Sequence, residues 1–116
     1  MQTEELLEIV KTTLDENKGG DIKVIDVRGR TSVTDYMVLA TGTSERHLRA
    51  LSDHVLDAVK KRDFKPLGVE GKQAGDWVLV DLGDVVVHVM SAQTRAFYQL
   101  EKLWETVYSG RSAASA

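Results

Sequence analysis

The sequence predicts an α/β (α+β) fold in which one mixed five-stranded sheet is flanked by helices. Runs rich in β-branched residues alternate with helical patterns in the order α-β-β-α-β-β-β-α. Two apolar runs are separated only by Gly83-Asp84, which is typical of a tight β-hairpin. The 116 residues show no repeat and no linker, so we expect a single domain over residues 1–110 and a flexible C-terminal tail over residues 111–116.

The chain is expected to begin with a helix and two strands. Residues 4–16 repeat leucine, isoleucine and valine at helical spacing, and Thr3 is predicted as the N-cap. Residues 21–27 are rich in β-branched side chains and should form a strand. Residues 36–41 are nearly all apolar, so this second strand should be buried on both faces.

A second helix should run from the turn at residues 42–44 to about Arg62, with Thr43 or Ser44 as its cap. Its core-facing positions recur at helical spacing and are Leu48, Leu51, Val55 and Val59. Residues 64–71 contain the only proline of the chain, which favours an edge strand or a loop there.

The hairpin sets a register. If Gly83 and Asp84 alone form the turn, Leu82 faces Val85. Side chains alternate along a strand, so one face is entirely aliphatic and should be core; its pairs are Val80 with Val87 and Val78 with Val89. The other face mixes aromatic, imidazole and carboxylate groups with apolar ones; its pairs are Trp77 with Met90, Leu79 with His88, and Asp81 with Val86. Such a face suits a second core or a partner.

A last helix should follow the hairpin and pack on the sheet. Its apolar stripe comprises Ala96, Phe97, Leu100, Leu103, Trp104 and Val107. Leu100 and Leu103 are expected to join the hairpin valines in one core. Tyr98 falls on the polar face beside Glu101. It is either a lone exposed tyrosine, which is common, or an anchor for binding, because Tyr and Trp are enriched at interface hot spots.

The composition excludes several classes of protein. A net charge of −3 and a pI of about 5.6 argue against broad nucleic-acid binding, so we expect no direct DNA binding. The chain has no cysteine, which excludes disulfides and thiolate metal sites. The acidic, amphipathic start is unlike a signal peptide, and no apolar run approaches the roughly 20 residues of a membrane span. A cytoplasmic protein that does not bind membranes is expected.

The residues that could carry chemistry form no catalytic pattern. Residues 42–44 could bind a phosphate but lack the P-loop lysine and spacing, so a capped turn is the simpler interpretation. Four carboxylates could contribute to a metal site, without an Asp-x-Asp pair to support it: Asp26, Asp35, Asp81 and Asp84. His88 is a buried hydrogen-bonding group, an interface group or a general base. Ser44 has no evident base partner. We therefore predict a binding module rather than an enzyme, with no catalytic residue, metal or cofactor.

Six short motifs follow one another between residues 4 and 108. They are Asp35-Tyr36, Gly42-x-Ser44-x-Arg46-His47, Glu70-Gly71, Trp77-x-x-x-Asp81, Val87-His88 and Arg95-x-x-Tyr98-x-Leu100-Glu101-x-Leu103-Trp104. Together they resemble the bacterial ribosomal silencing factors (RsfS), also called iojap-like proteins. The resemblance implies a nucleotidyltransferase-like fold. The paired carboxylates that follow the Gly-Ser turn in nucleotidyltransferases are missing here, which argues against inherited catalysis.

The resemblance also implies a function. Members of this family bind the large ribosomal subunit through its fourteenth ribosomal protein and sterically block joining of the small subunit. This represses translation during starvation. Members of the family often form homodimers. The family's partner-binding surface is built on the last strands and the last helix. The contact candidates carried over are Trp77, His88, Tyr98 and Glu101, followed by Asp81 and Glu70. A ribosomal protein is usually basic, so Glu101 and Glu105 would suit it.

Two alternatives stay open at this point. A nucleotide-binding or nucleotidyltransferase-like enzyme would bind phosphate at Ser44 and hold Mg²⁺ at Asp35 or Asp81. A homodimer would use the exposed aromatic residues for self-association alone. A calorimetric titration with nucleotide and Mg²⁺ separates the enzyme from a ribosome-binding repressor.

Overall fold

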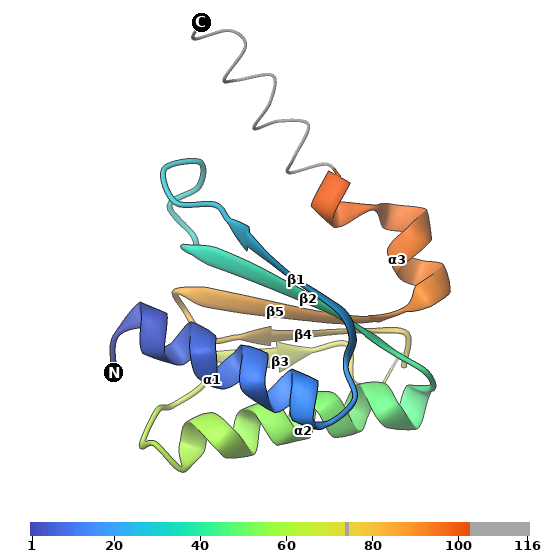
Figure 1. The fold of residues 1–116 in the computed structure, drawn as a ribbon, viewed down its shortest axis with the longest axis horizontal. Helices are drawn as coiled ribbons and strands as arrows, with labels where there is room; N and C mark the ends of the chain where they lie inside the picture. The colour runs from blue at the N-terminus through green and yellow to red at the C-terminus, as the bar shows by residue number, and fades with distance from the viewer. Residues whose placement is uncertain (74, 103–116) are drawn as a thin grey trace, which may run out of the picture.

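The protein folds as one mixed sheet with helices packed on it. The structure is a computed structural model that describes residues 1–73 and 75–102. Its elements are α1 (Thr3–Glu16), β1 (Gly20–Asp26), β2 (Tyr36–Gly42), α2 (Glu45–Lys60), β3 (Gly68–Glu70), β4 (Trp77–Asp81), β5 (Val85–Ser91) and α3 (Ala92–Tyr98). The strand order is β1-β2-β5-β4-β3 (Figure 1). β2 and β5 run parallel, while β1–β2, β4–β5 and β3–β4 are antiparallel. The predicted fold class and element order are confirmed.

The β4–β5 hairpin has the predicted register. The backbone N–H of Leu82 donates to the carbonyl of Val85 at 2.9 Å, and all five predicted pairs beyond it are present. Gly83 takes a φ of +86°, which glycine adopts without strain. The Asp81 carboxylate accepts the Gly83 N–H at 2.9 Å, so the turn is held from both of its strands.

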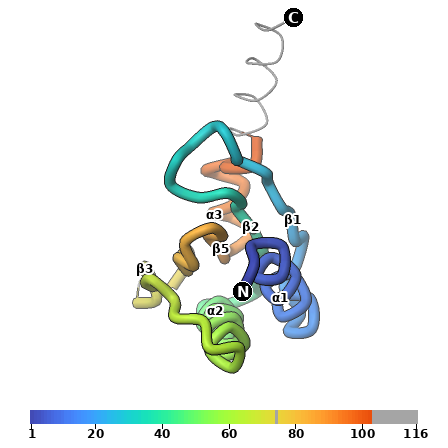
Figure 2. The backbone as a smooth tube through the Cα atoms, turned by 90° about the vertical axis from the view of Figure 1, so that its left-hand side faces the viewer, coloured from blue at the N-terminus to red at the C-terminus, as the bar shows by residue number. Residues whose placement is uncertain are grey.

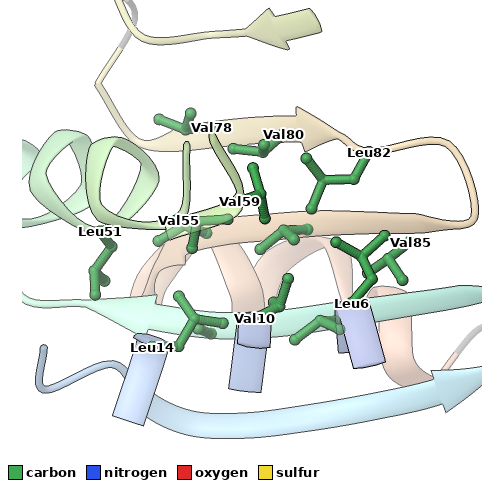
Figure 3. Packing of buried hydrophobic residues seen from close by; sticks show 14 of the residues in the cluster. Leu6, Val10, Leu14, Leu51, Val55, Val59, Val78, Val80, Leu82 and Val85 are labelled. Atoms are coloured by element: carbon green, nitrogen blue, oxygen red, sulfur yellow. The ribbon is translucent and has the colours of Figure 1, made fainter. Parts of the chain in front are cut away.

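One face of the sheet carries the main core, covered by α1 and α2 (Figure 2). The predicted inward side chains of α2 and of the hairpin are fully or almost fully buried here, as Figure 3 shows for several of them. The buried members of this core are Leu6, Val10 and Leu14 of α1, Leu48, Leu51, Val55 and Val59 of α2, Val38, Ala40, Val78, Val80, Val85, Val87 and Val89 of the strands, and Leu82 of the hairpin turn. Aliphatic burial on this scale is the main favourable term in folding.

The opposite face carries a second, smaller core. Its buried members are Val27, Met37, Leu39 and Met90, with Ile25, Trp77 and Leu100 packed against them. The prediction that Leu100 joins the hairpin valines is therefore wrong, because the segment after β5 lies on the other side of the sheet. Leu103, Trp104, Val107 and the predicted tail over residues 111–116 lie outside the described residues.

The two N-caps predicted from the sequence have different outcomes. Ser44 caps α2 as predicted, and its Oγ accepts the backbone N–H of His47 at 3.0 Å. The prediction of Thr3 as the cap of α1 is wrong: the cap position is Gln2, and Thr3 is the first helical residue. Thr3 Oγ1 instead donates to the carboxylate of Asp84 at 2.8 Å, which ties α1 to the hairpin turn. Within residues 1–73 and 75–102, no helix has the length and apolar character needed to cross a membrane.

We predict that Val87→Ala lowers the free energy of unfolding by roughly 1–3 kcal/mol, because the valine is fully buried and its loss leaves a cavity. Urea unfolding of both proteins measures this difference. Val33→Ala, at a valine that is 77% exposed, serves as the matched control and should change stability little. Equal midpoints for Val87→Ala and the wild type would contradict the placement of the core.

Candidate partner-binding site

Trp77 begins β4 and lies on the face of the second core, opposite Met90. The loop before it runs close against its backbone. Gly71 has a φ of +88°, and a Cβ at this position would lie 2.2 Å from the carbonyl oxygen of Trp77. Only glycine fits this approach without displacing the strand. Lys72 Nζ forms an ion pair with Asp53 Oδ1 of α2 at 2.6 Å, which also links this loop to the helix.

His88 accepts a hydrogen bond from the indole of Trp77. The Trp77 Nε1–H donates to His88 Nδ1 at 3.1 Å, and the two ring centroids are 5.9 Å apart. His88 is 6% exposed and pairs in register with Leu39 on one side and Leu79 on the other. Because Nδ1 accepts this hydrogen bond, the imidazole is neutral with its proton on Nε2. Of the three interpretations of His88, the structure favours the buried hydrogen-bonding group.

Two further aromatic rings continue from Trp77 across α3. The ring centroids of Tyr98 and Trp77 are 4.9 Å apart. The Phe97 ring packs edge-on against Tyr98, with their centroids 5.0 Å apart. Phe97 is 79% exposed and Tyr98 is 53% exposed. We call Trp77, Phe97 and Tyr98 the aromatic surface. Its rings touch one another while two of them face solvent, which is typical of a binding anchor.

α3 is short and anchored at several points. Ser91 caps it by accepting the N–H of Thr94 at 3.1 Å. Arg95 is the helix residue that turns inward, 5% exposed, and its guanidinium donates to the Asp21 carbonyl at 2.6 Å and to Thr41 Oγ1 at 3.0 Å. These bonds join α3 to β1 and β2. The motif Arg95-x-x-Tyr98 was the sequence signal for this arginine, but its spacing alone assigned it no role.

The prediction of one unbroken final helix is wrong within the described residues, because the helix is interrupted at Gln99 before residues 100–102 are helical again. α3 ends at Tyr98, because Gln99 takes the left-handed conformation with a φ of +50°. Arg95 occupies the inward direction, so Ala96 and Phe97 are exposed rather than buried. Glu101 therefore does not share one polar helix face with Tyr98. It accepts a hydrogen bond from Arg95 Nε at 3.1 Å, and its side chain is only 22% exposed.

Within the described residues, neither of the two remaining candidates has a ring contact or hydrogen bond with the aromatic surface. Asp81 is at the far end of β4 from Trp77, where it holds the hairpin turn. Glu70 is exposed on the edge strand β3, in register with Leu79. The structure thus brings together Trp77, His88 and Tyr98 of the six predicted contact residues, and it adds Phe97 to them.

The turn at residues 42–44 is a capped turn. Ser44 Oγ is occupied by capping, and His47 Nδ1 accepts the Thr43 N–H at 3.0 Å while Nε2 bonds the Asn17 carbonyl at 3.0 Å. Asp26 accepts from Arg28, and these hydrogen bonds hold the pKa of the Asp26 carboxyl below its usual value. Over the described part of the chain, no three His, Asp or Glu side chains are placed to hold a metal ion. What the candidate partner-binding site offers is the apolar and aromatic contact area of the aromatic surface.

This chain belongs to the family of ribosomal silencing factors. Residues 1–115 match the family described as "Ribosomal silencing factor during starvation". The ribosomal silencing factor of Haemophilus influenzae is 48% identical over 99 residues, which cover 85% of this chain and 97% of that protein. Mouse "Mitochondrial assembly of ribosomal large subunit protein 1" is 39% identical over 101 residues, covering 84% of this chain and 44% of that longer protein. Chloroplastic Iojap of maize is 34% identical over 89 residues, covering 77% of this chain and 39% of that protein.

Two solved structures have the same fold. A crystal structure of a Chromobacterium violaceum protein superimposes with a TM-score of 0.88 at 40% identity, covering 90% of this chain and 88% of that one. A crystal structure from Bacillus halodurans gives a TM-score of 0.80 at 32% identity, covering 88% of this chain and 95% of that one. The predicted family resemblance is confirmed.

We predict that His88 makes the protein less stable in mild acid. Burial lowers the pKa of His88 to about 4, whereas an unfolded histidine titrates near 6.5. Between pH 6.5 and pH 4, His88 is protonated in the unfolded chain but remains neutral in the folded protein. The contribution of His88 to the free energy of unfolding is therefore complete above pH 6.5. It decreases by on the order of 3 kcal/mol as the pH falls towards 4.

Urea unfolding of the wild type and of His88→Gln at pH 7 and pH 4.5 tests this. Glutamine keeps an acceptor for the indole N–H but does not titrate, so the variant should lose less stability in acid. All other ionisable groups are common to the two proteins, so the comparison isolates the contribution of His88. An identical loss in both proteins would show that His88 contributes nothing to the pH dependence.

Proposed function

We propose that this protein represses translation in the cytoplasm by binding the large ribosomal subunit through its fourteenth ribosomal protein. The bound factor then occupies space that the small subunit needs, so the subunits do not join. Family membership supports a ribosomal partner, and the names of two relatives refer to ribosomal silencing and to assembly of the large ribosomal subunit.

The observation that carries this proposal is the aromatic surface. Trp77 lies on β4 and Tyr98 on α3, and their ring centroids are 4.9 Å apart. Phe97 adds a third ring that is largely exposed to solvent. Large aromatic side chains that are exposed and in contact are the usual anchors of a protein interface. No enzymatic step is needed for this function, since occupation of the surface is itself the effect.

The aromatic surface is held in place before any partner arrives. The hydrogen bond to His88 fixes the orientation of the indole, and Arg95 fixes α3 against the sheet. A side chain that is already ordered loses less conformational entropy on binding, which leaves more of the contact energy as affinity. A rigid body on the subunit face would also obstruct joining more effectively than a flexible one.

We predict that Tyr98→Ala weakens binding to purified large subunits about 30-fold or more, because loss of a central aromatic anchor commonly costs at least ~2 kcal/mol. The same variant should relieve the block on subunit joining, measured by light scattering on mixing the two subunits. Tyr98 is half exposed, so the fold should survive the change.

Leu67→Ala is the matched control, because Leu67 is 70% exposed but adjoins the β4–β5 turn, away from Trp77. It should co-sediment with large subunits as the wild type does. If Tyr98→Ala and Trp77→Ala are folded and bind large subunits with wild-type affinity, the aromatic surface is not the ribosomal site. A dimer that dissociates in these variants would instead assign the surface to self-association.

A further inference from the structure

A small cavity opens beside the aromatic surface. It has a volume of about 270 Å³ and is lined by Asp76, Ser91, Gln93, Thr94, Phe97 and Tyr98. Its residues come from the loop before β4, from the end of β5 and from α3, so three separate segments build it. None of the six predicted contact residues except Tyr98 lines it.

The carboxylate of Asp76 is the charged group of this cavity. Its backbone is fixed, because the Asp76 carbonyl accepts the N–H of Ser91 at 3.1 Å. Among the described residues, the carboxylate receives one long hydrogen bond, from Thr94 Oγ1 to Oδ2 at 3.5 Å. A carboxylate has about four acceptor positions, so most of its capacity is left for another donor. Asp76 is exposed, which makes this capacity available to a partner.

The rings of Phe97 and Tyr98 supply the apolar part of the cavity. They meet edge-on with centroids 5.0 Å apart, and both are more than half exposed. The faces of aromatic rings carry negative charge and attract cations. A carboxylate beside aromatic faces is suited to a group that is positively charged and has an apolar stem, as lysine and arginine side chains do.

We propose that this cavity binds a lysine or arginine side chain of the ribosomal protein on which the factor docks. This proposal rests on the proposed function and specifies its chemistry. The sequence predicted Glu101 as the acidic contact for a basic partner, but Glu101 is already paired with Arg95. Asp76, by contrast, is an exposed carboxylate that lines the cavity beside the aromatic surface. The same charge would repel the phosphates of ribosomal RNA, so a protein side chain is the better match.

The test measures the affinity for purified large subunits at low and high salt. Asp76→Asn keeps the shape and removes the charge, so binding should weaken about tenfold at low salt, and the difference should shrink as salt rises. Asp76→Lys should weaken binding further, because two positive charges would face each other. Phe97→Leu keeps apolar area without the aromatic face and should weaken binding a few-fold.

Asp57→Lys is the matched control for Asp76→Lys, because both substitutions change the net charge by the same amount. Asp57 is exposed on α2. The Asp57→Lys variant should bind within about twofold of the wild type. Thermal melts show that each variant is folded.

The result separates this proposal from the one it rests on. If Trp77→Ala loses binding while Asp76→Asn and Asp76→Lys bind like the wild type, the cavity takes no basic side chain but the ribosomal site stands. Tighter binding by Asp76→Lys would also overturn the proposal and would indicate phosphate at the cavity. If Trp77→Ala and Tyr98→Ala bind large subunits normally, the proposed site itself is wrong.

Discussion

The central strand β5 is the element on which the rest of the structure depends. It pairs with β2 in parallel and with β4 in antiparallel register, and Val85–Met90 is buried throughout. Alternate side chains of this strand face opposite sides of the sheet. Val85, Val87 and Val89 fill the core under α1 and α2, whereas His88 and Met90 lie on the side of Trp77. One strand therefore secures the main core and supports the aromatic surface.

The aromatic surface is positioned by polar contacts as well as by packing of Trp77 on the second core. His88 holds the indole of Trp77, and Arg95 joins α3 to the carbonyl of Asp21 and the hydroxyl of Thr41. Buried polar groups need partners with good geometry, so each of these contacts allows few alternative arrangements. The aliphatic core provides stability, while these contacts fix where the aromatic rings point.

The sequence allowed the sheet to be predicted better than the last helix, for physical reasons. The hairpin register follows from two local facts, a turn that glycine permits and the alternation of side chains. The placement of α3 on the sheet depends on Arg95, whose partners Asp21 and Thr41 are 74 and 54 residues away along the chain. Helical periodicity cannot detect such contacts. It therefore continued the helix through Gln99 and placed Phe97 in the core.

The candidate site was predictable in part. Trp77 and Tyr98 were exceptional because aromatic residues stood on faces that should be polar or mixed, and the structure brings their rings into contact. Asp76 and Phe97 carried no such signal, since Asp76 resembles an ordinary loop residue and Phe97 fitted an apolar stripe.

The most direct measurement is a cryo-electron microscopy map of purified large subunits with this protein bound. Our account predicts that the start of β4 and α3 contact a ribosomal protein on the surface that meets the small subunit, with Trp77 and Tyr98 at the centre of the interface. Contact made through the α1–α2 layer, with the aromatic surface facing solvent, would contradict it.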